Sequence, residues 1–127
     1  MALAEGKCPP TVAIPAKRSL DGLTMLVVED EPVIRLDLQQ TLEKAGARVL
    51  AANDVESARR LIERPDLSAA VLDWFGADIC RRLTERGVPF VFYTGRAASG
   101  LEGWQHVPMV SKPAKPEDII TALERLL

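Results

Sequence analysis

Apolar and polar residues follow two different rhythms along the chain from residue 23 onward. Short runs of consecutive apolar residues are typical of strands that are buried on both faces of a sheet. Between these runs, apolar residues recur every three or four positions, which is typical of helices with one buried face. The pattern predicts strands at residues 25–28, 48–51, 69–72, 89–93 and 107–110.

Prolines and glycines mark the ends of the first two predicted helices. Pro32 suits the first turn of a helix, where its missing N–H is not needed, and Gly46 suits the stop after that helix. Asn53 and Glu56 stand three residues apart and are predicted to cap the second helix, which ends before Pro65. The buried stripe of the first helix is predicted to contain Ile34, Leu38 and Leu42.

Two more helices are predicted, and the segment between the last two strands is unusual. One helix runs roughly over residues 78–86 and is stopped by Gly87, and the final helix begins at Pro116. The link over residues 95–106 is short and rich in glycine, so we expect no full helix there. The buried stripe of the final helix is predicted to contain Ile119, Ile120, Leu123 and Leu127.

Strands joined by helical crossovers predict a parallel sheet that is covered by helices on both faces. A chain of 127 residues has the usual size of one domain, which we expect to span residues 21–127. The first twenty residues contain Pro9, Pro10 and Pro15 and show neither rhythm. Residues 1–20 are therefore predicted to form an extended or mobile arm.

Charge and hydropathy argue against several functional classes. The 16 Lys and Arg residues are scattered among 18 Asp and Glu residues, and the net charge of −2 predicts no nucleic-acid or anionic-membrane partner. The apolar runs are too short to span a bilayer, and residues 1–20 hold no apolar run of signal-peptide length. These features predict a cytoplasmic protein.

The cysteines and the single histidine predict no metal site of their own. Cys8 and Cys80 lie far apart, and two free thiols are favoured over a disulfide between them. With one histidine and two separated cysteines, we expect no zinc site, and His106 is predicted to be a surface residue without a role.

Polar residues stand where the predicted strands end. Because the carboxyl ends of parallel strands lie at one edge of the sheet, we expect these side chains to converge although they are far apart in sequence. Crowded carboxylates favour Mg²⁺, and a nearby lysine and hydroxyl suit phosphoryl oxygens. Of the residues named next, Glu31 is predicted not to take part in the site but to be a solvated residue whose charge stabilises the start of the following helix. The residues concerned are Glu29, Asp30, Glu31, Asp73, Thr94 and Lys112.

Four short stretches resemble the signature stretches of bacterial response-regulator receiver domains. They are residues 27–32 (Val-Val-Glu-Asp-Glu-Pro), 71–73 (Val-Leu-Asp), 94–95 (Thr-Gly) and 111–113 (Ser-Lys-Pro), and they occur in the family's order. Residues 89–95 further resemble single-domain receivers whose fourth strand closes on a Phe-x-Thr-Gly turn. The resemblance implies a flavodoxin-like, doubly wound fold, with a five-stranded parallel sheet in the order 2-1-3-4-5 and a fourth helix that is short or missing.

The resemblance also implies roles for individual residues. Asp73 is the expected acceptor of a phosphoryl group from a sensor histidine kinase. Asp30 and Asp73 are expected to bind Mg²⁺ directly, together with the backbone carbonyl of Phe75, and Glu29 is expected to hold metal-bound water.

Around the phosphoryl group, the resemblance implies that Thr94 supplies the switch hydroxyl and Lys112 the phosphate-binding ammonium. Receivers bend sharply after this lysine, so we predict a cis Lys112–Pro113 peptide. Phe75 and Arg96 flank the expected path of the attacking water. The Phe75 ring offers that water no hydrogen bond and Arg96 can close the entrance, which predicts slow self-dephosphorylation.

Three departures from the family leave the function open. The loop after Asp73 is shortened, which puts the Phe75 carbonyl ligand in question, Met109 replaces the expected switch aromatic, and the fourth helix is reduced. The favoured hypothesis is a phosphorylation switch, a monomer or weak dimer, that signals to an unidentified downstream protein by contact. It catalyses only its own phosphotransfer and dephosphorylation. The alternatives are a pseudo-receiver, which interacts without phosphorylation, and an aspartate-nucleophile phosphatase.

Overall fold

A computed structural model of the chain describes residues 20–73, 77–95, 103–104 and 106–127. Within them, five parallel strands form one sheet in the order β3-β2-β4-β5-β6, which is 2-1-3-4-5 along the chain and confirms the predicted topology. The strands are β2 (Thr24–Val28), β3 (Arg48–Ala52), β4 (Ala69–Leu72), β5 (Phe90–Thr94) and β6 (Met109–Ser111).

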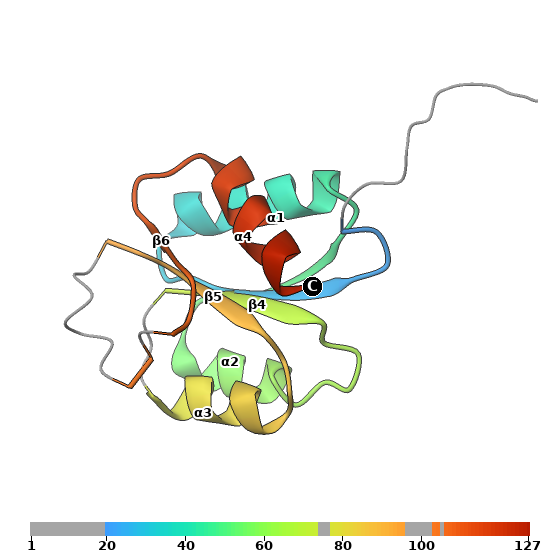
Figure 1. Ribbon diagram of the computed structural model, residues 1–127, viewed down its shortest axis with the longest axis vertical. Coiled ribbons are helices and arrows are strands. Elements are labelled where there is room, and N and C mark those ends of the chain that lie inside the picture. The colour runs from blue at the N-terminus through green and yellow to red at the C-terminus, as the bar shows by residue number, and fades with distance from the viewer. Residues whose placement is uncertain (1–19, 74–76, 96–102, 105) are drawn as a thin grey trace, which may run out of the picture.

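Four helices in the described part of the chain cover both faces of the sheet. Figure 1 shows α1 and α4 on one face and α2 and α3 on the other, as the crossover pattern predicted. Among these residues, no helix is long and apolar enough to cross a membrane. The helices are α1 (Pro32–Lys44), α2 (Val55–Leu61), α3 (Ala77–Glu85) and α4 (Pro116–Leu126).

The core has two halves, one on each face of the sheet. Successive residues of a strand point to opposite faces, so a strand covered on both sides must be apolar throughout. In β2, Met25 and Val27 pack in the half beneath α1 and α4, whereas Leu26 and Val28 pack in the half beneath α2 and α3. All four side chains are fully buried, which explains why the sequence shows a continuous apolar run there.

Position 46, just after the end of α1, favours glycine for two reasons. Its φ of +104° lies in the left-handed region that favours glycine, and a Cβ at this position would collide with the Asp21 side chain. The predicted stop after the first helix is therefore confirmed. Leu20 is fully buried, and its N–H donates to the Ala45 carbonyl at 2.9 Å, so this last residue of the predicted arm packs with the domain. Residues 1–19 lie outside the described part.

Three local predictions were wrong. The cap of α2 is Asp54, one residue after Asn53; its extended backbone lets its carboxylate accept the Ser57 N–H at 2.8 Å. Leu127 lies beyond the end of α4 and is 52% exposed. The last strand begins at Met109 because the Val107 N–H donates to the Trp104 carbonyl in a turn.

The predicted absence of a full helix between β5 and β6 falls largely on residues that the structure does not describe, 96–102 and 105. The described residues of this link, Gly95, Gly103, Trp104 and His106, are not helical.

Candidate functional site

The candidate side chains stand at or just after the carboxyl ends of four strands, β2, β4, β5 and β6, and backbone hydrogen bonds hold them there. The Glu29 N–H donates to Ala52 of β3 at 3.0 Å, and the Asp73 N–H donates to Val28 of β2 at 2.9 Å. Each residue therefore extends the sheet by one position beyond its strand, so its place at the edge is fixed by the strand pairing.

Three carboxylates converge at this edge. Glu29, Asp30 and Asp73 each place an oxygen within 4.8 Å of the others, and we call these three residues the acidic cluster. Glu29 is 1% exposed, whereas Asp73 is 18% exposed and Asp30 faces solvent. The sequence prediction that these residues meet is confirmed.

Lys112 brings a positive charge to the acidic cluster. Its Nζ lies 2.8 Å from Glu29 Oε1 and 3.5 Å from Asp73 Oδ2. The Lys112 N–H donates to the carbonyl of Thr94, a fully buried residue at the end of β5, at 3.0 Å. The predicted lysine and threonine thus meet at the same edge. The Lys112–Pro113 peptide is cis, as predicted.

Burial and charge act against each other in this site. Burial raises the pKa of the Glu29 carboxyl above its ordinary value, although the contacts with Lys112 and with the Glu31 N–H, at 3.1 Å, oppose the rise. Burial by itself lowers the pKa of the Lys112 ammonium, but the carboxylates of Glu29 and Asp73 outweigh it and raise that pKa. Lys112 is therefore a cation throughout the neutral range.

The donor set suits a hard divalent cation. Among the described residues, the three carboxylates of the acidic cluster outnumber the single ammonium that contacts them, that of Lys112, and each offers an oxygen as a ligand atom. Mg²⁺ prefers a few carboxylates together with water and phosphate oxygens. The predicted fourth ligand, the Phe75 carbonyl, lies outside the described residues, as do Trp74, Arg96 and the body of the shortened loop. Glu31 is exposed, as expected for a solvated residue.

Two residues at the site were missed by the sequence reasoning. Arg35 of α1 donates from Nη1 to the Glu29 carbonyl at 2.9 Å and so braces the chain next to Asp30. Tyr93 of β5 contacts the segment that follows Lys112. A tyrosine inside an otherwise apolar strand was the available signal for the second, because a buried hydroxyl requires a hydrogen-bond partner. Arg35 carried no such signal.

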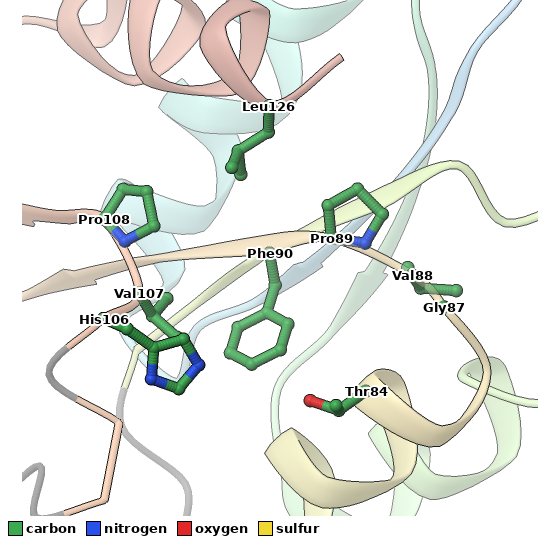
Figure 2. Close-up of a pocket in the computed structure, with 9 residues that line it drawn as sticks. All are labelled: Thr84, Gly87, Val88, Pro89, Phe90, His106, Val107, Pro108 and Leu126. Carbon is green, nitrogen blue, oxygen red and sulfur yellow. The ribbon is translucent and has the colours of Figure 1, made fainter.

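A cavity of about 540 Å³ lies away from the acidic cluster, around the amino ends of β5 and β6. Figure 2 shows the ring of Phe90 pointing into it, with Leu126 of α4 above. His106 lines this cavity and is exposed, in agreement with the prediction of a surface residue. Cys80 is a free, buried thiol whose pKa burial raises to about 12, while Cys8 lies outside the described residues.

Comparison with known proteins shows which proteins this chain resembles in sequence. No family model matches the chain. Over 122 residues it is 30% identical to the phosphate regulon transcriptional regulatory protein PhoB of Pseudomonas aeruginosa, covering 84% of this chain and 52% of PhoB. It is 31% identical over 126 residues to the probable transcriptional regulatory protein TcrX of Mycobacterium tuberculosis, covering 87% and 53%. The chain thus spans about half the length of these curated relatives.

Solved structures agree with the sequence relatives. A response regulator receiver protein from Sinorhizobium medicae superposes with a TM-score of 0.73 at 25% identity, covering 84% of this chain and 95% of that one. The non-phosphorylated HemR receiver domain from Leptospira biflexa superposes with a TM-score of 0.68 at 27% identity, covering 82% and 93%. The chain thus has the fold of response-regulator receiver domains and resembles them in sequence, as its signature stretches predicted.

Proposed function

We propose that this receiver domain is a phosphorylation-dependent switch of a two-component system, with Asp73 as the acceptor and a sensor histidine kinase as the donor. The observation that carries the proposal is the convergence of Glu29, Asp30, Asp73 and Lys112 at the carboxyl edge of the sheet. An isolated carboxylate is a weak nucleophile toward a phosphorylated donor because both are anionic. A site that supplies positive charge beside the nucleophile removes that obstacle.

In the proposed reaction, a carboxylate oxygen of Asp73 attacks the phosphorus as the bond from phosphorus to the donor nitrogen breaks. An acyl phosphate forms on Asp73, and the donor histidine takes up a proton. Mg²⁺, when bound, would neutralise phosphoryl and carboxylate charge. Lys112, already 3.5 Å from Asp73 Oδ2, is positioned to contact a phosphoryl oxygen. Buried Thr94, whose carbonyl holds the Lys112 backbone, would report the change to the domain.

The surface beside the acidic cluster supports a protein as the donor. The helix α1 begins three residues after Glu29, and two of its apolar side chains, Val33 and Leu36, are 74% and 55% exposed. They stand one turn apart and line a hollow of about 300 Å³. Such a patch suits an apolar helix face of a partner that presents its phosphohistidine to Asp73.

The pseudo-receiver alternative is not favoured. Its supporting features are the loop after Asp73, which lies outside the described residues, and Met109, which is 37% exposed on the edge strand. We propose further that the domain acts on no substrate other than its own phosphoryl group, and that its output passes to a downstream protein by contact.

Intact mass measurement with Mg²⁺ and a small acyl phosphate as donor tests the proposal. The parent is expected to gain one phosphoryl group, and chelation of the metal is expected to prevent it. Asp73→Asn is isosteric and is expected to remain unmodified. The control Asp78→Asn, which removes an exposed carboxylate of α3, is expected to be phosphorylated like the parent.

Each other outcome points to a different function. An unmodified parent would favour the pseudo-receiver, and continued turnover of the donor without retained phosphate would favour the phosphatase. A phosphate retained on the Asp73→Asn variant would reject Asp73 as the acceptor.

A further inference from the structure

Tyr93 joins β5 to the segment that follows the site lysine. Its hydroxyl lies 3.3 Å from both the carbonyl oxygen and the amide nitrogen of Ala114, so it donates to one and accepts from the other. Ala114 stands two residues after Lys112, just beyond the cis peptide. The Tyr93 side chain is 7% exposed and packs in the core half beneath α1 and α4. One buried hydroxyl therefore satisfies both backbone groups of a residue in this turn.

The ring of Tyr93 also contacts Lys112 itself. The ammonium lies 5.5 Å from the ring centroid, within the range of a cation–π interaction. The next residue of β5, Thr94, accepts the Lys112 N–H at 3.0 Å. The lysine is thus held at its backbone by Thr94, along its side chain by the Tyr93 ring, and two residues later by the Tyr93 hydroxyl.

This arrangement matters because a lysine side chain is flexible. Its ammonium has a choice of orientations around four rotatable bonds, and it contacts a phosphoryl oxygen only when the base of the side chain is fixed. At present the ammonium is shared between Glu29 and Asp73. A small shift of the Lys112–Ala114 turn would move it away from Asp73.

We propose that Tyr93 is a positioning residue that fixes the Lys112–Ala114 turn so that the ammonium meets the phosphoryl group on Asp73. This inference rests on the proposed function. Tyr93 contacts Ala114 and the Lys112 ammonium, whereas the acidic cluster follows β2 and β4, so we expect Tyr93 to act on the phosphoryl half of the site. Loss of Tyr93 is therefore expected to weaken phosphoryl binding and to leave Mg²⁺ binding alone.

The test uses Tyr93→Phe, which removes the hydroxyl and keeps the ring. The affinity for beryllium fluoride, which mimics a phosphoryl group on a carboxylate, is measured by titration at saturating Mg²⁺. Removal of two hydrogen bonds is expected to weaken it on the order of tenfold. The affinity for Mg²⁺, measured without beryllium fluoride, is expected to stay within about twofold of the parent. A general loosening of the site would instead lower the affinities for both Mg²⁺ and beryllium fluoride. Tyr93→Leu, which also removes the ring, is expected to bind beryllium fluoride more weakly still.

Two controls separate positioning from a merely structural role. Val91→Ala truncates a fully buried side chain of the same strand and the same core half. It is expected to lower the unfolding temperature without changing the affinity for beryllium fluoride. In a Lys112→Met background, Tyr93→Phe is expected to have no further effect on that affinity, because the residue acts through Lys112.

The outcomes are distinguishable. Equal affinities of the parent and Tyr93→Phe would overturn the role of Tyr93 while leaving the proposed function intact. The same weakening in Val91→Ala, or an undiminished effect in the Lys112→Met background, would also overturn it. A parent that binds no beryllium fluoride and accepts no phosphate would overturn both this inference and the proposed function.

Discussion

Two ion pairs in the described part of the chain differ in regularity and in burial. The shorter and more regular one joins α3 to the turn after α2, whereas the more buried one lies at the candidate site. Arg82 contacts Glu63 with two nitrogen–oxygen distances of 2.7 Å, yet the side chains are 45% and 49% exposed. Lys112 contacts Glu29 at 2.8 Å, and these side chains are 18% and 1% exposed. We call the Arg82–Glu63 contact the α2–α3 bridge.

The comparison shows that the geometry of an ion pair does not determine its contribution to stability. Water and salt reach the α2–α3 bridge, so either partner is well solvated when the other is removed. Glu29 has no such alternative, because almost none of its side chain is exposed to water. A buried charge that loses its partner incurs most of its desolvation penalty. The less regular contact is therefore expected to matter more for stability, and it is also the one that lies at the candidate site.

The largest effect is expected from Lys112→Met without added metal. The substitution leaves the Glu29 carboxylate buried without its ammonium, and we expect a loss of about 3 kcal/mol in the free energy of unfolding at neutral pH. Urea denaturation followed by circular dichroism measures it. The second substitution Glu29→Gln is expected to recover most of the loss, because it removes the charge and nearly preserves the shape.

The pH dependence of the Lys112→Met variant follows from the raised pKa of Glu29. A carboxyl group whose folded-state pKa exceeds its ordinary value of 4.5 binds more protons in the folded state. Stability therefore falls as the pH rises from 4.5 through the folded-state pKa. Removal of Lys112 raises that pKa further, so the variant's deficit is expected to shrink as the pH is lowered toward 4.5. A deficit that stays constant over this range would show that Glu29 is not its cause.

Mg²⁺ is expected to distinguish the candidate site from the exposed ion pairs of α2 and α3, because the excess negative charge lies in the acidic cluster. Binding to the folded state at a concentration 100 times the dissociation constant stabilises a protein by about 2.7 kcal/mol. We expect Mg²⁺ to raise the unfolding temperature of the parent and of Asp78→Asn, whose carboxylate lies in the exposed network of α2 and α3. In Asp30→Asn the rise is expected to be largely lost, and an equal rise in all three proteins would place the cation elsewhere.

The fold and most of the site were predictable because each rests on a rule that sequence exposes directly. Strands buried on both faces must be apolar throughout, so residues 25–28 and 69–72 were identifiable without alternation. Parallel strands end at one edge, so Asp30, Asp73 and Lys112 could be brought together although they are far apart in the chain.

The errors arose at the ends of elements, where the sequence pattern fits more than one boundary. Asn53 and Asp54 are both good caps, and only the backbone conformation of Asp54 decides between them. Ile119, Leu123 and Leu127 recur every four residues, but α4 ends at Leu126 and leaves Leu127 outside. The Tyr93–Ala114 contact is of another kind, because it depends on how the turn after a cis peptide folds back on β5, which no local pattern records.

The smallest effect is expected from Arg82→Gln, which breaks the α2–α3 bridge. Its contact holds the pKa of Glu63 below the ordinary value, chiefly through the hydrogen bond from the guanidinium. A depressed carboxyl pKa stabilises the folded state above the ordinary value of 4.5 and loses that contribution as the pH falls through the folded-state pKa. We therefore expect a slight drop in the unfolding midpoint at neutral pH that disappears in acid and at high salt.

Arg81→Gln is the matched control for that prediction, since Arg81 lies next to Arg82 on α3 and contacts Asp78 at a longer 3.4 Å. Both variants are expected to unfold close to the parent, and both are expected to lie far above Lys112→Met. If Arg82→Gln instead destabilised the domain as much as Lys112→Met, the regular geometry of the bridge would outweigh its exposure. Burial would then not be the property that distinguishes the two contacts.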